Sequence, residues 1–135
     1  MGIIIEEPAV LGNASGLKNL AYLYQIRNKK DNQYLSQIME HVGLDPGSKK
    51  PVKKYSLGMR QRLAIAQAIM EEPDILILDE PMNGLDKDGV REMRELFLKI
   101  KESGKTILMA SHNREDIEAL CDEVYEMEKG RLCRV

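Results

Sequence analysis

The carboxylate pair Asp79 and Glu80 follows four apolar residues, ILIL at 75–78. Such a run predicts a fully buried strand, and open α/β sheets bind ligands at the carboxyl ends of their strands. Two acids in succession there make a candidate metal and phosphate site. A strand end that simply turns polar at the surface would show the same pair, and the strand pattern alone leaves both interpretations open.

The stretch SGKT at 103–106 looks like the end of a phosphate-binding loop but fails its spacing. That loop, G-x-x-x-x-G-K-[ST], needs a glycine five positions before the second one, where Lys99 stands. It must also follow a strand and open a helix, whereas a helical pattern precedes SGKT and the strand-like TILMAS follows it. We therefore expect an ordinary helix-to-strand turn with Gly104 as the C-cap.

Other polar residues stand where an anion could be bound. Ser56 and Gly58, at a predicted helix start, offer unpaired N–H groups and the helix dipole, although Ser56 can equally be a plain N-cap. His112 follows a predicted strand and could contact a ligand at the sheet edge, although a lone histidine is more often structural. Asp86 can cap a long helix, and His41, inside an amphipathic helix, is interpreted as structural.

The elements that must position these residues predict an α/β fold. Before residue 73 we expect a short strand at 1–5 and three helices that begin at Ser15, Asn32 and Ser56. After residue 73 strands and helices alternate, which predicts a parallel sheet with right-handed crossovers. The expected strands there are 75–78, 106–110 and 123–127, and the expected helices are 86–101 and 113–120.

Composition excludes several classes of protein. The 135 residues are 43% apolar, enough for the core of one domain. A net charge of −2, from 20 basic and 22 acidic residues, gives no reason to expect a nucleic-acid partner. Cys121 and Cys133 have no metal-ligand spacing and indicate free thiols in a reducing compartment. Apolar runs are too short for a membrane span, so we expect a soluble, cytoplasmic chain.

Residues 55–86, YSLGMRQRLAIAQAIMEEPDILILDEPMNGLD, resemble the signature-to-Walker-B region of ATP-binding cassette (ABC) ATPases. YSLGM at 55–59 stands at the LSGGQ signature, NGLD at 83–86 at the D-loop, and Ser111 with His112 at the switch histidine. IIIEEP at 3–8 resembles the Q-loop region, with Glu6 where most of the family has glutamine. Some drug- and antibiotic-exporting ABC ATPases look similar at these positions. The resemblance covers essentially the whole chain.

The resemblance implies ATP and Mg²⁺ as cofactors and assigns the site residues. Mg²⁺ would be held by Asp79 and Glu6, and the catalytic residues would be Glu80 on the attacking water and His112 on the γ-phosphate. The remaining positions would contact the nucleotide, in part across a dimer interface: Ser56, Leu57, Gly58, Met59, Gln61, Glu6 and Asp86. Lys87, where the family often has proline, leaves the shape of the D-loop open.

No G-x-x-x-x-G-K-[ST] occurs in the 135 residues, so the chain resembles the later part of a P-loop NTPase domain without its Walker A strand and loop. The resemblance implies a Q-loop strand and loop at 1–14, a helical subdomain with the signature at 15–72, and a Walker B, D-loop and switch-histidine part at 73–135. In the family the Walker A strand lies between the strands corresponding to 106–110 and 123–127. We therefore expect these two strands to close up against each other or to pair with a second chain, as in a strand-swapped homo-oligomer.

The implied function is that of a partial ATP-binding subunit of an ABC transporter, which couples ATP binding and hydrolysis to export but is inactive in isolation. Its partners would be a second ATPase subunit, arranged head to tail, and a membrane permease that docks near residues 7–20. It would lie in the cytoplasm against the inner face of the membrane. The alternatives are a non-catalytic binding or dimerisation fragment and a non-transport ABC ATPase.

Overall fold

The residue before each α-helix caps its first turn with a side-chain oxygen. The computed structural model describes residues 2–4 and 11–135, the former by their backbone. Helix α2, Asn32–His41, begins one residue later than expected, because Asp31 rather than Asn32 accepts the Tyr34 N–H at 3.0 Å. Three other caps are those predicted: Ser15 before α1 Gly16–Tyr24, Ser56 before α3 Leu57–Ile69 and Asp86 before α4 Lys87–Glu102. Asn113, expected as the first residue of its helix, instead caps α5 Arg114–Leu120.

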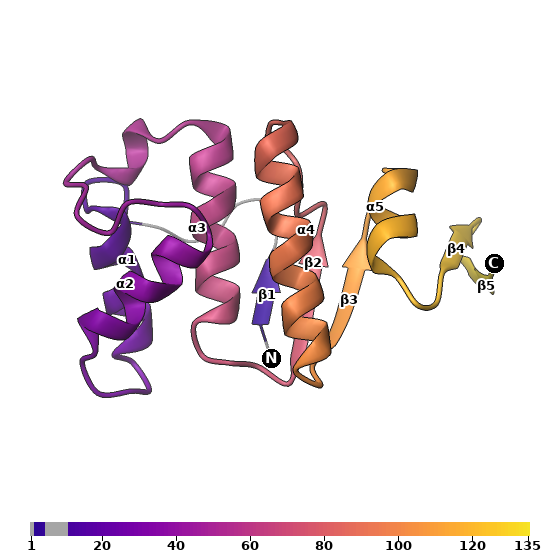
Figure 1. Ribbon diagram of the computed structural model, residues 1–135, viewed down its shortest axis with the longest axis horizontal. Coiled ribbons are helices and arrows are strands. Elements are labelled where there is room, and N and C mark those ends of the chain that lie inside the picture. Colours follow the sequence, from indigo (N-terminus) through magenta and orange to yellow (C-terminus); the bar gives the residue numbers. More distant parts are fainter. Residues whose placement is uncertain (1, 5–10) are drawn as a thin grey trace.

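Three strands form a parallel sheet in the order β1, β2, β3. β1 is Gly2–Ile4, β2 is Ile75–Asp79 and β3 is Thr106–Ala110. Figure 1 shows helices α1, α2 and α3 gathered at one end of the molecule, with the sheet and α4 beside them. The predicted α/β class, a helical part beside a parallel sheet, is confirmed.

The expected last parallel strand, 123–127, is wrong. β4 Tyr125–Glu128 instead pairs antiparallel with β5 Arg131–Arg134 as a separate hairpin. Lys129 and Gly130 both have positive φ, +49° and +76°, which is the backbone of a tight two-residue hairpin turn. This local pairing needs no long connection, and it leaves β3 and β4 unpaired with each other. The expected closing-up of these two strands is therefore wrong, and pairing with a second chain stays a prediction.

The core lies on one face of the sheet. Leu76 and Leu78 are each 1% exposed and share a cluster with Leu63 of α3 and Phe97 of α4. Ile75, on the other face, is 48% exposed, so the expectation of a fully buried ILIL strand is wrong. In the described part of the chain, the helices cover only one side of β2. Successive side chains of β2 point to opposite sides, so they are alternately buried and more exposed.

The SGKT stretch is the helix-to-strand turn that its spacing predicts. α4 ends at Glu102, and Gly104, with φ +92°, donates its N–H to the Lys101 carbonyl at 3.0 Å. β3 starts two residues later.

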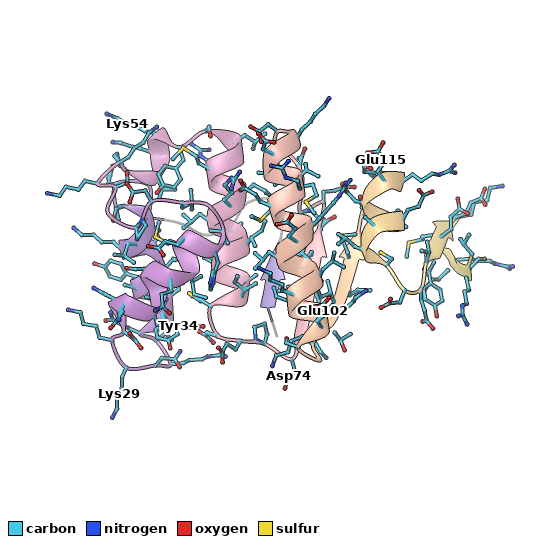
Figure 2. All side chains as sticks on the ribbon, in the orientation of Figure 1. Lys29, Tyr34, Lys54, Asp74, Glu102 and Glu115 are labelled. Carbon is cyan, nitrogen blue, oxygen red and sulfur yellow. The ribbon has the colours of Figure 1, made fainter. Side chains whose placement is uncertain are left out.

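No helix within the described ranges has the length and hydropathy that crossing a membrane requires. Charged side chains such as Lys29, Lys54 and Glu115 project outward from the ribbon (Figure 2).

Candidate functional site

Asp79 and Glu80 lie at the carboxyl end of β2, next to the carboxyl end of β3. Asp79 is the last residue of its strand, pairs in register with Ala110, and is exposed. Glu80 leaves the strand with φ +47° while its N–H donates to the Ala110 carbonyl at 2.9 Å. A non-glycine residue in this left-handed region costs about 1 to 3 kcal/mol, and such residues cluster at functional sites. The two carboxylates therefore stand at the sheet edge where ligands bind.

His112 is brought to Glu80 by the parallel pairing of β2 and β3. Its backbone N–H donates to Glu80 Oε1 at 3.0 Å, and its Nε2 lies 3.6 Å from the same oxygen. The His112 side chain is fully exposed, whereas that of Glu80 is 38% exposed. The structure thus joins two candidate residues that are 32 positions apart in the sequence. Each presents a polar group to solvent at one point of the sheet edge.

The residues predicted as a signature begin helix α3 beside the predicted D-loop. Ser56 Oγ accepts the Met59 N–H at 3.2 Å, so the local capping role is confirmed. Gly58 lies so near the D-loop that an added Cβ would be 2.9 Å from the Gly84 carbonyl oxygen. Gly84, with φ +80°, in turn faces Leu57, whose Cγ would be 2.7 Å from a Cβ there. The start of α3 and the loop after β2 therefore fit together only with glycine at both positions.

Gln61, predicted as a nucleotide contact, points its amide nitrogen at backbone. Its Nε2 donates to the Pro81 carbonyl at 2.8 Å and to the Glu80 carbonyl at 3.3 Å. Asp86 accepts the Gly89 N–H at 2.7 Å as the cap of α4. These contacts fix both residues in the structure, and their roles toward a nucleotide stay predictions.

Arg62 follows the predicted signature and links three helices. Its Nη1 donates to the Val42 carbonyl at the end of α2 and lies 2.9 Å from Glu92 of α4. An added Cβ at Gly89 would be 2.8 Å from its Nη2. Asn19, 2% exposed, was not predicted from the sequence, and it holds the loop before α1 by accepting the Leu11 N–H at 2.6 Å. Arg62 acts on a carbonyl 20 residues away and Asn19 on backbone groups of the loop just before its helix, and neither contact leaves a periodic signal.

Asp79 and Glu6 are the predicted Mg²⁺ ligands, and Glu6 lies outside the described residues. Within the described ranges, no three His, Cys, Asp or Glu side chains gather as a metal cage. Mg²⁺ keeps several waters and commonly takes only one or two carboxylates together with substrate phosphates. The exposed Asp79 beside Glu80 fits that mode of binding, in which the protein supplies few ligands.

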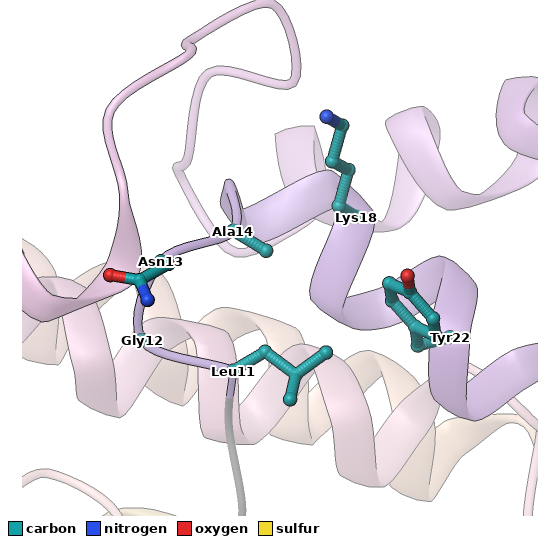
Figure 3. Close-up of a pocket in the computed structure, with 6 residues that line it drawn as sticks. All are labelled: Leu11, Gly12, Asn13, Ala14, Lys18 and Tyr22. Carbon is teal, nitrogen blue, oxygen red and sulfur yellow. The ribbon is translucent and has the colours of Figure 1, made fainter.

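A shallow depression of about 400 Å³ lies at the loop before α1 (Figure 3). Its walls combine the apolar side chains of Leu11 and Tyr22, 51% and 64% exposed, with the aliphatic and charged side chain of Lys18. The loop residues Gly12, Asn13 and Ala14 complete it. Except for Tyr22, the lining residues belong to the described part of the segment 7–20, where a partner is expected, and Glu7 itself lies outside the described residues.

Comparisons with known proteins agree with the motifs. The family described as ABC transporter matches residues 1–83. The chain is 46% identical to the uncharacterized ABC transporter ATP-binding protein YybJ of Bacillus subtilis, over 98% of this chain and 61% of the relative. It is 43% identical to the bacitracin transport ATP-binding protein BcrA of Enterococcus faecalis, over 98% of this chain and 43% of that one. It is also 39% identical to the lantibiotic transport ATP-binding protein SrtF of Streptococcus pyogenes, over 98% and 57%.

The chain thus spans roughly two fifths to three fifths of the length of these relatives, with near-complete coverage of its own sequence. The family match spans the strand β1, the helical part, the strand β2 and the residue pair Asp79 and Glu80 at its end. This protein therefore belongs to the ABC transporter family.

Proposed function

We propose that this protein acts in the ATP-binding subunit of an ABC transporter that exports an antibiotic or a related peptide. The observation that carries the proposal is the joining of Glu80 to His112 at the carboxyl end of a parallel strand, directly after Asp79. Relatives named as bacitracin and lantibiotic transport ATP-binding proteins support the export class.

In this proposal MgATP is bound at the sheet edge. Asp79 and Glu6 hold Mg²⁺, which neutralises phosphate charge. The Glu80 carboxylate accepts a proton from the attacking water, while His112 donates a hydrogen bond to the γ-phosphate. The observed contact between the His112 N–H and Glu80 Oε1 supports this division of labour, because it fixes one carboxylate oxygen and leaves the other available to water.

The start of α3 acts on a second nucleotide. In a head-to-tail dimer, the residues 56–59 contact the ATP held by the other subunit, and Asp86 lies at the interface between subunits. Exposure of Ser56 and of Leu57, 62% exposed, supports an approach by a partner's phosphates. A helix start with spare N–H groups favours an anion there.

A permease docks at the segment 7–20, and its described part lines the depression of Figure 3. Exposed Leu11 and Tyr22 offer apolar area, and Lys18 offers a positive charge, so we propose an amphipathic helix as the docking element. This arrangement places the protein on the cytoplasmic side of the membrane, bound to its permease rather than inserted.

We propose further that the 135 residues alone do not turn over ATP. None of them forms G-x-x-x-x-G-K-[ST], so the grip on the β- and γ-phosphates has to come from elsewhere. A second candidate function, a non-catalytic binding module, is favoured by the same absence and by the end position of β3 in the described sheet.

Calorimetric titration of the 135-residue chain with MgATP tests whether this chain binds the phosphates, with Asp79→Asn as the matched variant. We expect no detectable heat from either chain. Micromolar binding that disappears in Asp79→Asn would contradict this proposal, since the site would then work without a glycine-rich loop. Binding that survives the substitution would remove Asp79 from the site.

A further inference from the structure

The turn from Glu80 to Gly84 carries the candidate base in a left-handed backbone conformation. Glu80 has φ +47°, a region that side chains rarely adopt without support from their surroundings. Within the sheet and the turn itself, the Ala110 carbonyl accepts the Glu80 N–H at 2.9 Å, and the Asn83 N–H donates to the Glu80 carbonyl at 3.1 Å. Both contacts are made by backbone groups, and they hold only the N–H and the C=O of Glu80 itself.

Gln61 adds a contact from outside the turn. Its single amide nitrogen carries two N–H groups, and the structure gives each an acceptor, Pro81 O at 2.8 Å and Glu80 O at 3.3 Å. Pro81 is buried, and among the described residues its carbonyl has Gln61 as its hydrogen-bond partner. Without this donor, a buried carbonyl beside Glu80 would be left without a partner.

The first turns of α3 therefore hold the loop at both ends. Gly58 packs against the carbonyl of Gly84, and Gln61, one turn later, bonds the carbonyls of Glu80 and Pro81. Because both contacts come from the same helix, a displacement of its start would reach the Glu80 turn through them. The helix that carries the predicted signature is thus coupled directly to the candidate base.

We propose that Gln61 is a positioning residue, which sets the Glu80 carboxylate by holding the backbone of its turn from helix α3. This role rests on the function proposed above for Glu80, and it differs from direct contact with a nucleotide. Through these hydrogen bonds, a movement of the α3 start towards a phosphate would shift the carboxylate that acts on water.

The test compares Gln61→Leu with Gln67→Leu in the full-length protein. Gln67 lies on the same helix, and its buried Nε2 has no partner among the described residues, so it offers the same substitution without a link to Glu80. The first readout is the amide resonance and exchange rate of His112, whose N–H donates to Glu80 Oε1. We expect Gln61→Leu to shift this resonance and raise the exchange rate as Glu80→Ala does, while Gln67→Leu leaves both unchanged.

The second readout is steady-state ATP hydrolysis. A positioning role predicts that Gln61→Leu lowers kcat by about 10- to 100-fold with KM within about twofold of the parent, because the loss falls on the transition state. A raised KM with an unmoved His112 amide would overturn the proposal and make Gln61 a nucleotide contact. Should Gln61→Leu fail to fold, Gln61→Met removes the donor with less change of shape.

The two readouts separate failure of the inference from failure of the proposed function. If the full-length protein hydrolyses no ATP, the function proposed for Glu80 fails, and the His112 amide still decides whether Gln61 positions the turn. If hydrolysis is normal in Gln61→Leu and the amide is unmoved, Gln61 has no positioning role and the proposed function stands.

Discussion

The ion pair between Arg94 and Asp116 joins helix α4 to helix α5, which follows His112. Asp116, in the first turn of α5, is only 2% exposed, and its Oδ1 accepts Arg94 Nε at 2.9 Å and Nη2 at 2.6 Å. Arg94→Met would leave this carboxylate buried without its partner, which costs about 3 to 5 kcal/mol when one member of a buried pair is removed. Because the Arg94 side chain is 26% exposed and water can partly replace it, we predict the lower end, about 3 kcal/mol.

Urea unfolding measures this loss. For a small domain with a slope of about 2 kcal/mol/M, a loss of about 3 kcal/mol lowers the urea midpoint by about 1.5 M. Arg91→Met is the matched control on the same helix, since its pair with Asp88 is exposed on both sides, at 68% and 76%. We expect that control to lose at most about 0.5 kcal/mol.

The double variant Arg94→Met with Asp116→Leu separates a buried charge from lost packing. Replacing both partners with apolar groups is often close to neutral, so most of the stability should return. Equal losses for Arg94→Met and Arg91→Met would refute the reasoning, because the Asp116 carboxylate would then be hydrated. The result bears on the site, since α5 begins two residues after His112.

Two further predictions concern other parts of the molecule. Burial, followed by the charge of nearby Glu72, raises the pKa of Tyr34 to about 12. The free energy that Tyr34 contributes to stability is therefore fully present below its unfolded pKa of 10.0 and is lost as pH rises towards 12. Unfolding by urea from pH 8 to 12 should show this alkaline loss (Tyr34 is labelled in Figure 2). Tyr34→Phe should make the loss smaller without removing it, because burial also raises the pKa of Tyr55; equal pH profiles would contradict the assignment. Gly58→Ala gains about 1 kcal/mol of helix propensity but must displace the Gly84 carbonyl, which costs about 1 to 3 kcal/mol, so the variant should be less stable by up to about 2 kcal/mol. A thermal melt that shows Gly58→Ala to be more stable would mean that this contact is loose.

Local chemistry in the sequence predicted the helices and the main parallel strands well. Ser15, Ser56 and Asp86 cap their helices as expected, because capping is a contact between residues three apart. The meeting of Glu80 with His112 follows from a general rule, that parallel strands bring their carboxyl ends to one edge.

What the sequence failed to predict depends on contacts between distant groups. The bonds of Gln61 and Arg62 to backbone carbonyls, and the burial of Asp116, have no periodicity by which to find them. The parallel strand expected at 123–127 is wrong because its apolar residues suit a parallel strand and a hairpin equally well. The positive φ angles of Lys129 and Gly130 form the tight turn that makes it a hairpin.

The most direct test of the proposed site is Glu80→Gln in the full-length protein, with Glu118→Gln at an exposed position as its control. If Glu80 acts on the attacking water, Glu80→Gln binds MgATP but does not hydrolyse it, and the nucleotide recovered from the protein is ATP. The control should hydrolyse at the parent's rate. Hydrolysis unchanged in Glu80→Gln would contradict the central claim, because the carboxylate beside His112 would then take no part in the reaction.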